Sequence, residues 1–96
     1  MYKESMRKIF REALEAFGVR AQLTMMQEEC AEAIVAISHF KRGRPEGLDE
    51  MKEEIADTYI MAGQIIEFIG TEEMEKVIED KLQKKIRRLL DEHKRN

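Results

Sequence analysis

The positions of the glycines and of the single proline along the sequence are the feature that most constrains how this chain can fold. Four of the five glycines, together with the proline, interrupt a sequence that is otherwise rich in strong helix formers. These interruptions are Gly18, Gly43, Pro45, Gly47 and Gly70. Between them, apolar residues recur at the i, i+3, i+4 and i+7 spacing of an amphipathic helix. The pattern predicts four helices, over residues 3–17, 19–42, 48–69 and 71–93, with one true loop at residues 43–47.

The number and length of these helices define the expected fold class. A chain of 96 residues is the size of one domain, so residues 1–96 are expected to form a single all-α domain. The short loop favours antiparallel packing of the two long helices, which predicts an antiparallel four-helix bundle-like arrangement. A chain this short buries only about 60–65% of the surface that its unfolded form exposes. We therefore expect the domain to be oligomeric.

Composition excludes several classes of protein. The formal net charge is only −3 although 39% of the residues are charged, which argues against a generic binder of nucleic acid polymers. The one cysteine, Cys30, rules out an internal disulfide and a cysteine-rich zinc site. No segment resembles a signal peptide, and none is apolar over the roughly 18–20 residues that span a bilayer. We expect a cytoplasmic protein without a membrane partner.

Two clusters of carboxylates lack the basic neighbours that solvated helices usually provide. Acidic residues on exposed helices tend to alternate with lysine or arginine three or four positions away. Residues 21–38 and 53–75 contain no lysine or arginine, yet each stretch holds three neighbouring acids. These acids are Glu28, Glu29, Glu32, Glu53, Glu54 and Asp57. Several share a helix face with apolar residues, which indicates that they point inward or into a cleft.

Such a cluster predicts a bound cation. Like charges that face one another repel strongly, so the acids must be protonated or neutralised by a metal ion. Oxygen ligands converging from two helices suit Mg²⁺ or Mn²⁺. The alternative is an ordinary solvated acidic stripe. A ferritin-like di-iron site needs Glu-x-x-His, but neither His39 nor His93 has a glutamate three positions earlier. No group of residues has the spacing of zinc ligands.

The two acidic motifs resemble those of the MazG-like family of all-α nucleoside triphosphate pyrophosphohydrolases. Residues 28–32, Glu-Glu-Cys-Ala-Glu, match the family pattern E-E-x-x-E. Residues 54–57, Glu-Ile-Ala-Asp, match the pattern E-x-x-D. The resemblance covers about residues 19–69 well and the fourth predicted helix loosely, and its context looks like that of small single-domain members.

The resemblance implies hydrolysis of a nucleoside triphosphate or deoxynucleoside triphosphate to the monophosphate and pyrophosphate. It implies Mg²⁺ as cofactor, with Mn²⁺ possible, and a homodimer or homotetramer. The implied metal ligands are Glu29, Glu32, Glu54 and Asp57. Glu28 would complete the catalytic acids, either as a group outside the metal's ligands or as a base for the attacking water.

Two alternatives to this function stay open. Related enzymes of the superfamily act on phosphoribosyl-ATP or dUTP, so the substrate can differ within the same chemistry. The chain can also be a non-enzymatic helical oligomerisation module whose acid cluster binds a structural cation.

Candidate substrate-binding residues lie outside the acid clusters. A basic group follows the second helix, where the alternative is a solubilising loop at a helix C-terminus. Related enzymes place basic residues of a helix comparable to the fourth near the substrate phosphates; the alternative is a solvated face that pairs with its own acids. Gln22 could bind a nucleobase or a ligand carboxylate, or be a plain polar helix residue. The full set is Gln22, Lys41, Arg44, Lys81, Lys84 and Lys85.

Overall fold

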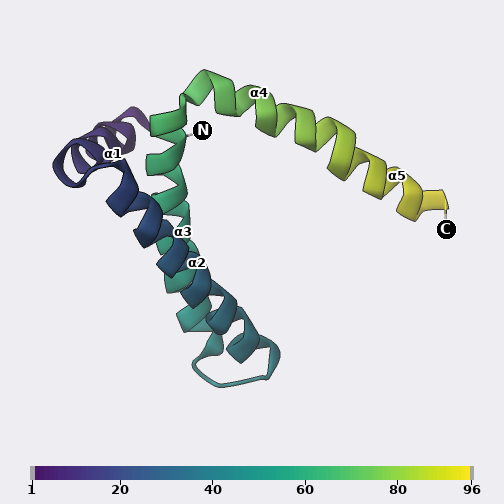
Figure 1. Ribbon diagram of the computed structural model, residues 1–96. Helices are drawn as coiled ribbons and strands as arrows, with labels where there is room; N and C mark the ends of the chain where they lie inside the picture. The colour runs from purple at the N-terminus through teal and green to yellow at the C-terminus, as the bar shows by residue number, and fades with distance from the viewer. Residues whose placement is uncertain (1, 96) are drawn as a thin grey trace.

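The computed structural model describes residues 2–95, and nearly all of them are helical (Figure 1). The elements are α1 (Glu4–Phe17), α2 (Val19–Lys41), α3 (Gly47–Ile69), α4 (Thr71–Lys81), the π-helical turn η1 (Leu82–Ile86) and α5 (Arg87–Arg95). No strand occurs in this part of the chain, which confirms the all-α prediction. The ends of the four predicted helices fall within two residues of the observed ones, with α4, η1 and α5 forming the fourth.

Helices α2 and α3 form an antiparallel hairpin, and they contact each other more extensively than any other pair of elements (Figure 1). Gly43 turns the chain after α2 with a φ of 76°, a left-handed conformation that favours glycine. At the start of α3, a Cβ atom on Gly47 would lie 2.8 Å from the Cα of Phe40. Because that neighbour is backbone, a larger residue at this position would force the two helices apart.

Helix α1 packs against α3 through one buried aromatic ring. Phe10 is only 3% exposed, and its ring fills the space that a side chain on Gly63 would need. The ring of Tyr2 meets Phe10 edge-on, with 5.3 Å between the ring centroids. The Tyr2 hydroxyl donates a 2.8 Å hydrogen bond to the backbone carbonyl of Tyr59. The absence of a side chain at residue 63 therefore creates the socket that positions α1.

A network of ion pairs also joins α1 to α3. Arg7 and Arg11 donate hydrogen bonds of 2.9 Å and 2.8 Å to the two carboxylate oxygens of Glu67. The Glu67 side chain is nearly buried, and the hydrogen bond from Arg7 holds its pKa below the ordinary value. The same arginines bind the exposed Glu4. This network neutralises an acid that would otherwise be costly to bury.

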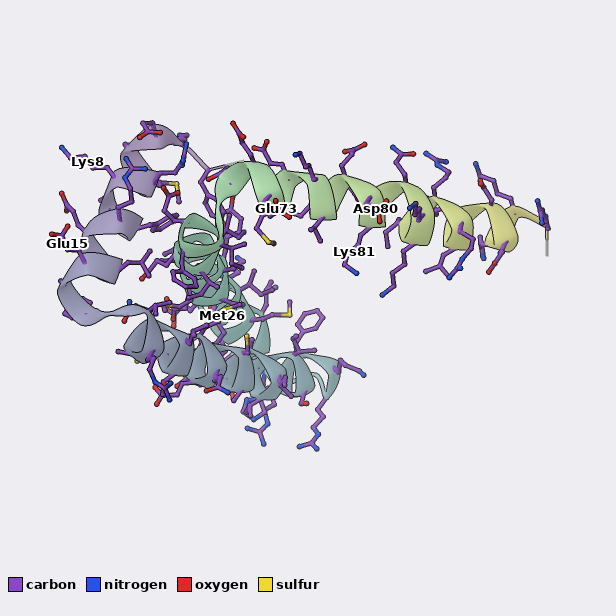
Figure 2. The ribbon with its side chains drawn as sticks, turned by 45° about the horizontal axis from the view of Figure 1, so that its top comes forward. Lys8, Glu15, Met26, Glu73, Asp80 and Lys81 are labelled. Carbon is purple, nitrogen blue, oxygen red and sulfur yellow. The ribbon has the colours of Figure 1, made fainter. Side chains whose placement is uncertain are left out.

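The last quarter of the chain forms an arm, defined here as residues 71–95, that leaves the body of the protein (Figure 1). Of the elements in the described residues, only α3 touches the arm, through α4 next to the connecting Gly70. Side chains project from the arm on all sides with no other helix beside it (Figure 2). The molecule measures 50 × 37 × 22 Å as a result. Packing of the fourth helix into a four-helix bundle is therefore not confirmed within one chain.

No helix in the described range combines the length and the hydrophobicity that crossing a bilayer requires.

A buried pair of glutamines joins α2 to α3. Gln22 Nε2 donates a 2.6 Å hydrogen bond to Gln64 Oε1, and the two residues are 7% and 6% exposed. Replacing Gln64 by leucine is expected to lower the free energy of unfolding by about 1–3 kcal/mol, because the buried Gln22 amide loses its partner. Urea unfolding measures this loss. The double variant Gln22→Leu/Gln64→Leu should recover most of it, and a double variant as unstable as the sum of the single ones would contradict the pairing.

Candidate metal centre

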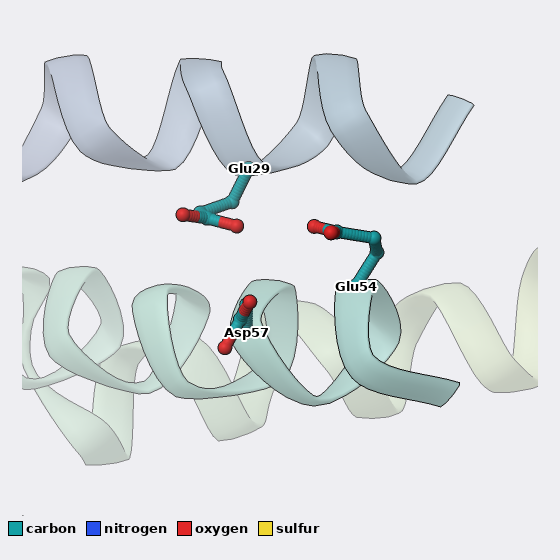
Figure 3. A group of neighbouring side chains, drawn as sticks. All are labelled: Glu29, Glu54 and Asp57. Carbon is teal, nitrogen blue, oxygen red and sulfur yellow. The ribbon is translucent and has the colours of Figure 1, made fainter. Parts of the chain in front are cut away.

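Three carboxylates from the α2–α3 hairpin converge on one point (Figure 3). Glu29 reaches down from α2, and Glu54 and Asp57 face it from α3. One oxygen from each carboxylate lies within 4.8 Å of the other two. Glu54 and Asp57 share a helix face because they are three residues apart. The antiparallel packing of α2 then brings Glu29 opposite that face.

Two of these carboxylates have an oxygen that is buried and unpaired. Glu29 Oε2 and Glu54 Oε2 are shielded from solvent and accept no hydrogen bond from any residue that the structure describes. None of the ion pairs formed by residues 2–95 involves either glutamate or Asp57. A buried charged oxygen without a partner is strongly unfavourable. The cluster therefore needs a proton or a cation to compensate its charge.

The pKa values of the cluster follow from its burial and its negative charge. Burial, followed by the adjacent Glu32 carboxyl group and the charges of Glu29 and Asp57, raises the pKa of Glu54 to about 7. Burial also raises the pKa of Glu29, with further contributions from the nearby Glu32 and Asp57. Without a cation, Glu54 therefore holds its proton to a higher pH than an ordinary glutamate does. Protonation of Glu54 and binding of a cation are two competing ways to relieve the same repulsion.

Glu32 extends the acidic surface beyond the group of three. It lies one helical turn after Glu28 and is exposed, but it stands close enough to Glu54 to affect its pKa. Glu32, Glu50 and Glu54 line a cleft of about 350 Å³ whose remaining walls are small apolar residues of α2. Glu28 is exposed and lies outside the group of three. The five predicted catalytic acids thus fall into three sets. Glu29, Glu54 and Asp57 converge. Glu32 lies beside them at the cleft, and Glu28 lies on the surface.

The predicted substrate-binding residues lie at three different places. Gln22 is buried against Gln64, so its amide is engaged in the core. Lys41 and Arg44 are exposed at the loop of the hairpin, and Lys41 lies about 18 Å along α2 from Glu29 at 1.5 Å per residue. The remaining three, Lys81, Lys84 and Lys85, are exposed on the arm and lie away from the cluster of their own chain.

Sequence reasoning missed two interactions beside the cluster. The Thr58 hydroxyl donates to the backbone carbonyls of Glu54 at 2.8 Å and Glu29 at 3.4 Å, which ties α2 to α3 beside the carboxylates. His39 Nδ1 lies 2.7 Å from a carboxylate oxygen of Glu50, next to the cleft. The Thr58–Glu54 bond lies within α3, whereas the contacts from Thr58 to Glu29 and from His39 to Glu50 have no signal in the sequence, because they depend on the register of two helices that meet only in the folded chain.

The raised pKa values predict that stability without divalent cations falls as pH rises from about 5 to 8. The folded state holds the Glu54 proton up to about pH 7, whereas an ordinary glutamate releases it near 4.5. The folded state therefore binds more protons in this interval, and stability decreases as pH rises through it. Glu29 acts in the same direction, and Glu4 and Glu67, whose pKa values are lowered, act only at more acidic pH.

Thermal unfolding in the presence of a chelator measures this dependence. The slope of the midpoint against pH should become smaller in Glu54→Gln, which has no proton to release. A wild-type midpoint that stays constant or rises between pH 5 and 8 would contradict the raised pKa.

Comparison with known proteins gives no match to any protein-family model, curated protein or solved structure. The resemblance to MazG-like enzymes therefore rests on the two acidic motifs alone.

Proposed function

We propose that this protein is a Mg²⁺-dependent hydrolase that converts a nucleoside or deoxynucleoside triphosphate to its monophosphate and pyrophosphate. The observation that carries the proposal is the convergence of Glu29, Glu54 and Asp57 with two buried, unpaired carboxylate oxygens. Carboxylate oxygens are the donors that Mg²⁺ and Mn²⁺ prefer. The resemblance of residues 28–32 and 54–57 to the MazG-like motifs supplies the reaction.

Each part of the site has a role in the proposal. A bound divalent cation would neutralise phosphate charge and lower the pKa of a water molecule. Glu29, Glu54 and Asp57 hold that cation, and Glu32 joins them from the edge of the cleft. Thr58 joins the two helices beside the carboxylates through its hydrogen bond to the Glu29 carbonyl. Glu28, as the accessory acid, accepts a proton from the attacking water or orients the ligands.

Phosphate groups also need cations from the protein. In the proposal, Lys41 and Arg44 at the hairpin loop, or lysines of the arm, contact the triphosphate. Phosphoryl transfer depends mainly on positioning and on charge neutralisation, so these residues contribute without forming covalent bonds to the substrate. The activity fits nucleotide-pool housekeeping in the cytoplasm.

A panel of ribonucleoside and deoxynucleoside triphosphates, incubated with the protein and Mg²⁺ and assayed for pyrophosphate, tests this function. Phosphoribosyl-ATP belongs in the panel, since related enzymes act on it. Release of pyrophosphate from any member, dependent on Mg²⁺, supports the proposal and identifies the substrate class. Lack of turnover of every member by a folded, homogeneous preparation would reject it in favour of a helical oligomerisation module with a structural cation.

A further inference from the structure

The outer part of the arm presents an apolar stripe that meets no other helix of its own chain. We call residues 81–95 the distal arm; it contains the last residue of α4, the π-helical turn η1 and α5. Its four large apolar side chains are between 44% and 50% exposed, and their helical spacing places them on one side. These residues are Leu82, Ile86, Leu89 and Leu90. Exposed apolar side chains that adjoin one another in this way mark an interaction surface.

The two parts of the arm carry opposite charges. Residues 71–80 hold five acids and one lysine, whereas residues 81–95 hold seven lysines or arginines and two acids. The arm as a whole is therefore almost neutral, but the distal arm has a net charge of +5. A surface that complements the distal arm must be negatively charged.

Basic residues lie along both edges of the stripe. At about 100° of rotation per residue, two lysines fall on one edge, and an arginine and a lysine fall on the other. These four residues are Lys81, Lys85, Arg87 and Lys94. None of them forms an ion pair with a residue that the structure describes. The ion pairs of this segment involve Lys84 and Arg88 instead. The cations beside the stripe are therefore the ones without an acidic partner in the described part of the chain.

This arrangement is typical of a helix that lies flat on a membrane surface. Such helices combine a basic polar face with an opposing apolar face and are hydrophilic on average, as α5 is. Lysine and arginine at the boundary extend their charged ends to the lipid headgroups, while their methylene stems lie beside the apolar stripe. The finding that no described helix could cross a bilayer does not bear on this mode of binding. A helix in the interface needs neither the length nor the continuous hydrophobicity of a spanning helix.

We propose that the distal arm binds the surface of an anionic lipid bilayer, with its apolar stripe inserted among the headgroups. The segment is about 22 Å long at 1.5 Å per residue, and it lies at the end of the arm away from the body (Figure 1). A planar anionic surface meets both basic edges of the stripe at once. The same surface repels the acids of residues 71–80, which keeps the rest of the protein off the bilayer.

This peripheral binding replaces the expectation of no membrane partner, which depends on the lack of a spanning segment. The binding does not require the acid cluster to hold a metal ion, so it is tested separately from the proposed activity.

Sedimentation of the intact protein with lipid vesicles tests the proposal. Vesicles of phosphatidylcholine and phosphatidylglycerol in equal amounts provide the anionic surface, and vesicles of phosphatidylcholine alone provide the neutral control. The protein should pellet with the anionic vesicles and stay in solution with the neutral ones. Salt at about 1 M should release most of it, because the screening length falls to about 3 Å. Absence of binding to the anionic vesicles, or equal binding to both kinds, would overturn the proposal.

The charge requirement is tested on one edge of the stripe. Lys81→Gln/Lys85→Gln should weaken binding to the anionic vesicles about 30-fold, because each basic residue near such a surface contributes a factor of about five. Lys8→Gln/Lys52→Gln removes the same charge at exposed positions of α1 and α3 and should bind like the wild type. Equal weakening of the two double variants would show that net charge, and not the distal arm, drives the binding.

The apolar requirement is tested with two aliphatic residues of the arm. Leu82 and Val77 are 50% and 41% exposed, but Val77 lies about 140° around the helix from Leu82, outside the stripe. Leu82→Gln should weaken vesicle binding about tenfold, because a leucine side chain no longer enters the apolar layer. The matched control Val77→Gln should bind like the wild type, and circular dichroism should show equal helix content in both.

Equal binding by these two variants would contradict insertion of the stripe. Sedimentation without lipid distinguishes the other occupant of the stripe. A protein that binds no vesicles but self-associates, and loses that association in Leu82→Gln alone, would assign the stripe to a protein partner and reject the membrane.

Discussion

Replacing Glu54 by glutamine is expected to reduce pyrophosphate release by at least about 100-fold and to stabilise the metal-free protein. The substitution removes a proposed metal ligand, and loss of even the outer partners of a metal site costs about 10–100-fold. It also removes the acid whose pKa is most strongly raised by burial and by its acidic neighbours. At pH 8 the glutamine has no charge to repel Glu29 and Asp57, so the thermal midpoint in a chelator should increase.

The expected stabilisation is measurable in a domain of this size, because 1 kcal/mol shifts the midpoint by about 4–8 °C. Added Mg²⁺ should raise the midpoint of the wild type, since a ligand that binds only the folded state stabilises it. The same addition should have little effect on Glu54→Gln. Opposite changes in activity and in metal-free stability distinguish a metal ligand from a residue that merely supports the fold, whose loss would lower both.

Glu53→Gln is the matched control, because it makes the same change one residue earlier on α3 at an exposed position. It should retain activity and leave the chelated midpoint unchanged. Full activity of Glu54→Gln, or equal losses in the two variants, would contradict the assignment of the metal site.

Replacing Phe10 by alanine is expected to lower the free energy of unfolding by about 3–5 kcal/mol. The ring is 3% exposed and fills the socket above Gly63, so its removal leaves a cavity between α1 and α3. Small domains are stable by only about 5–15 kcal/mol, which makes this a large share of the total. Denaturant unfolding followed by circular dichroism provides the measurement.

Phe17→Ala makes the identical change at the end of the same helix, where the ring is 67% exposed. That variant should stay within about 0.5 kcal/mol of the wild type, as surface substitutions usually do. Similar losses for the two variants would show that Phe10 is not the main contact that positions α1.

The local features of the fold were predictable from the sequence because they depend on neighbours along the chain. Glycines at 18, 43, 47 and 70 mark helix ends because glycine adopts left-handed conformations and weakens helices. The ends of all four helices therefore agreed with the structure to within two residues. The apolar period did not show which of the apolar residues would be buried. Phe10 and Phe17 belong to the same predicted face, yet only Phe10 meets a glycine in another helix.

The candidate site divides in the same way. The spacing of Glu54 and Asp57 predicted that they share a helix face. The lack of basic neighbours predicted that a cation or bound protons balance the negative charge of the cluster. Only the register of α2 against α3 determined that Glu29 completes the trio, that Glu32 lies at its edge and that Glu28 faces solvent. Gln22 was a candidate for ligand binding, but its position opposite Gln64 engages it in the core.

By itself, the sequence determined the helices, their ends and the acidic character of the two long ones, since these depend on residues within a few positions of one another. The tertiary structure decided which carboxylates converge, which oxygens are left without partners and where the arm points. The convergence of the carboxylates depends on contacts between residues 25 or more positions apart, such as Glu29 with Glu54, and no local pattern encodes the distance between their side chains.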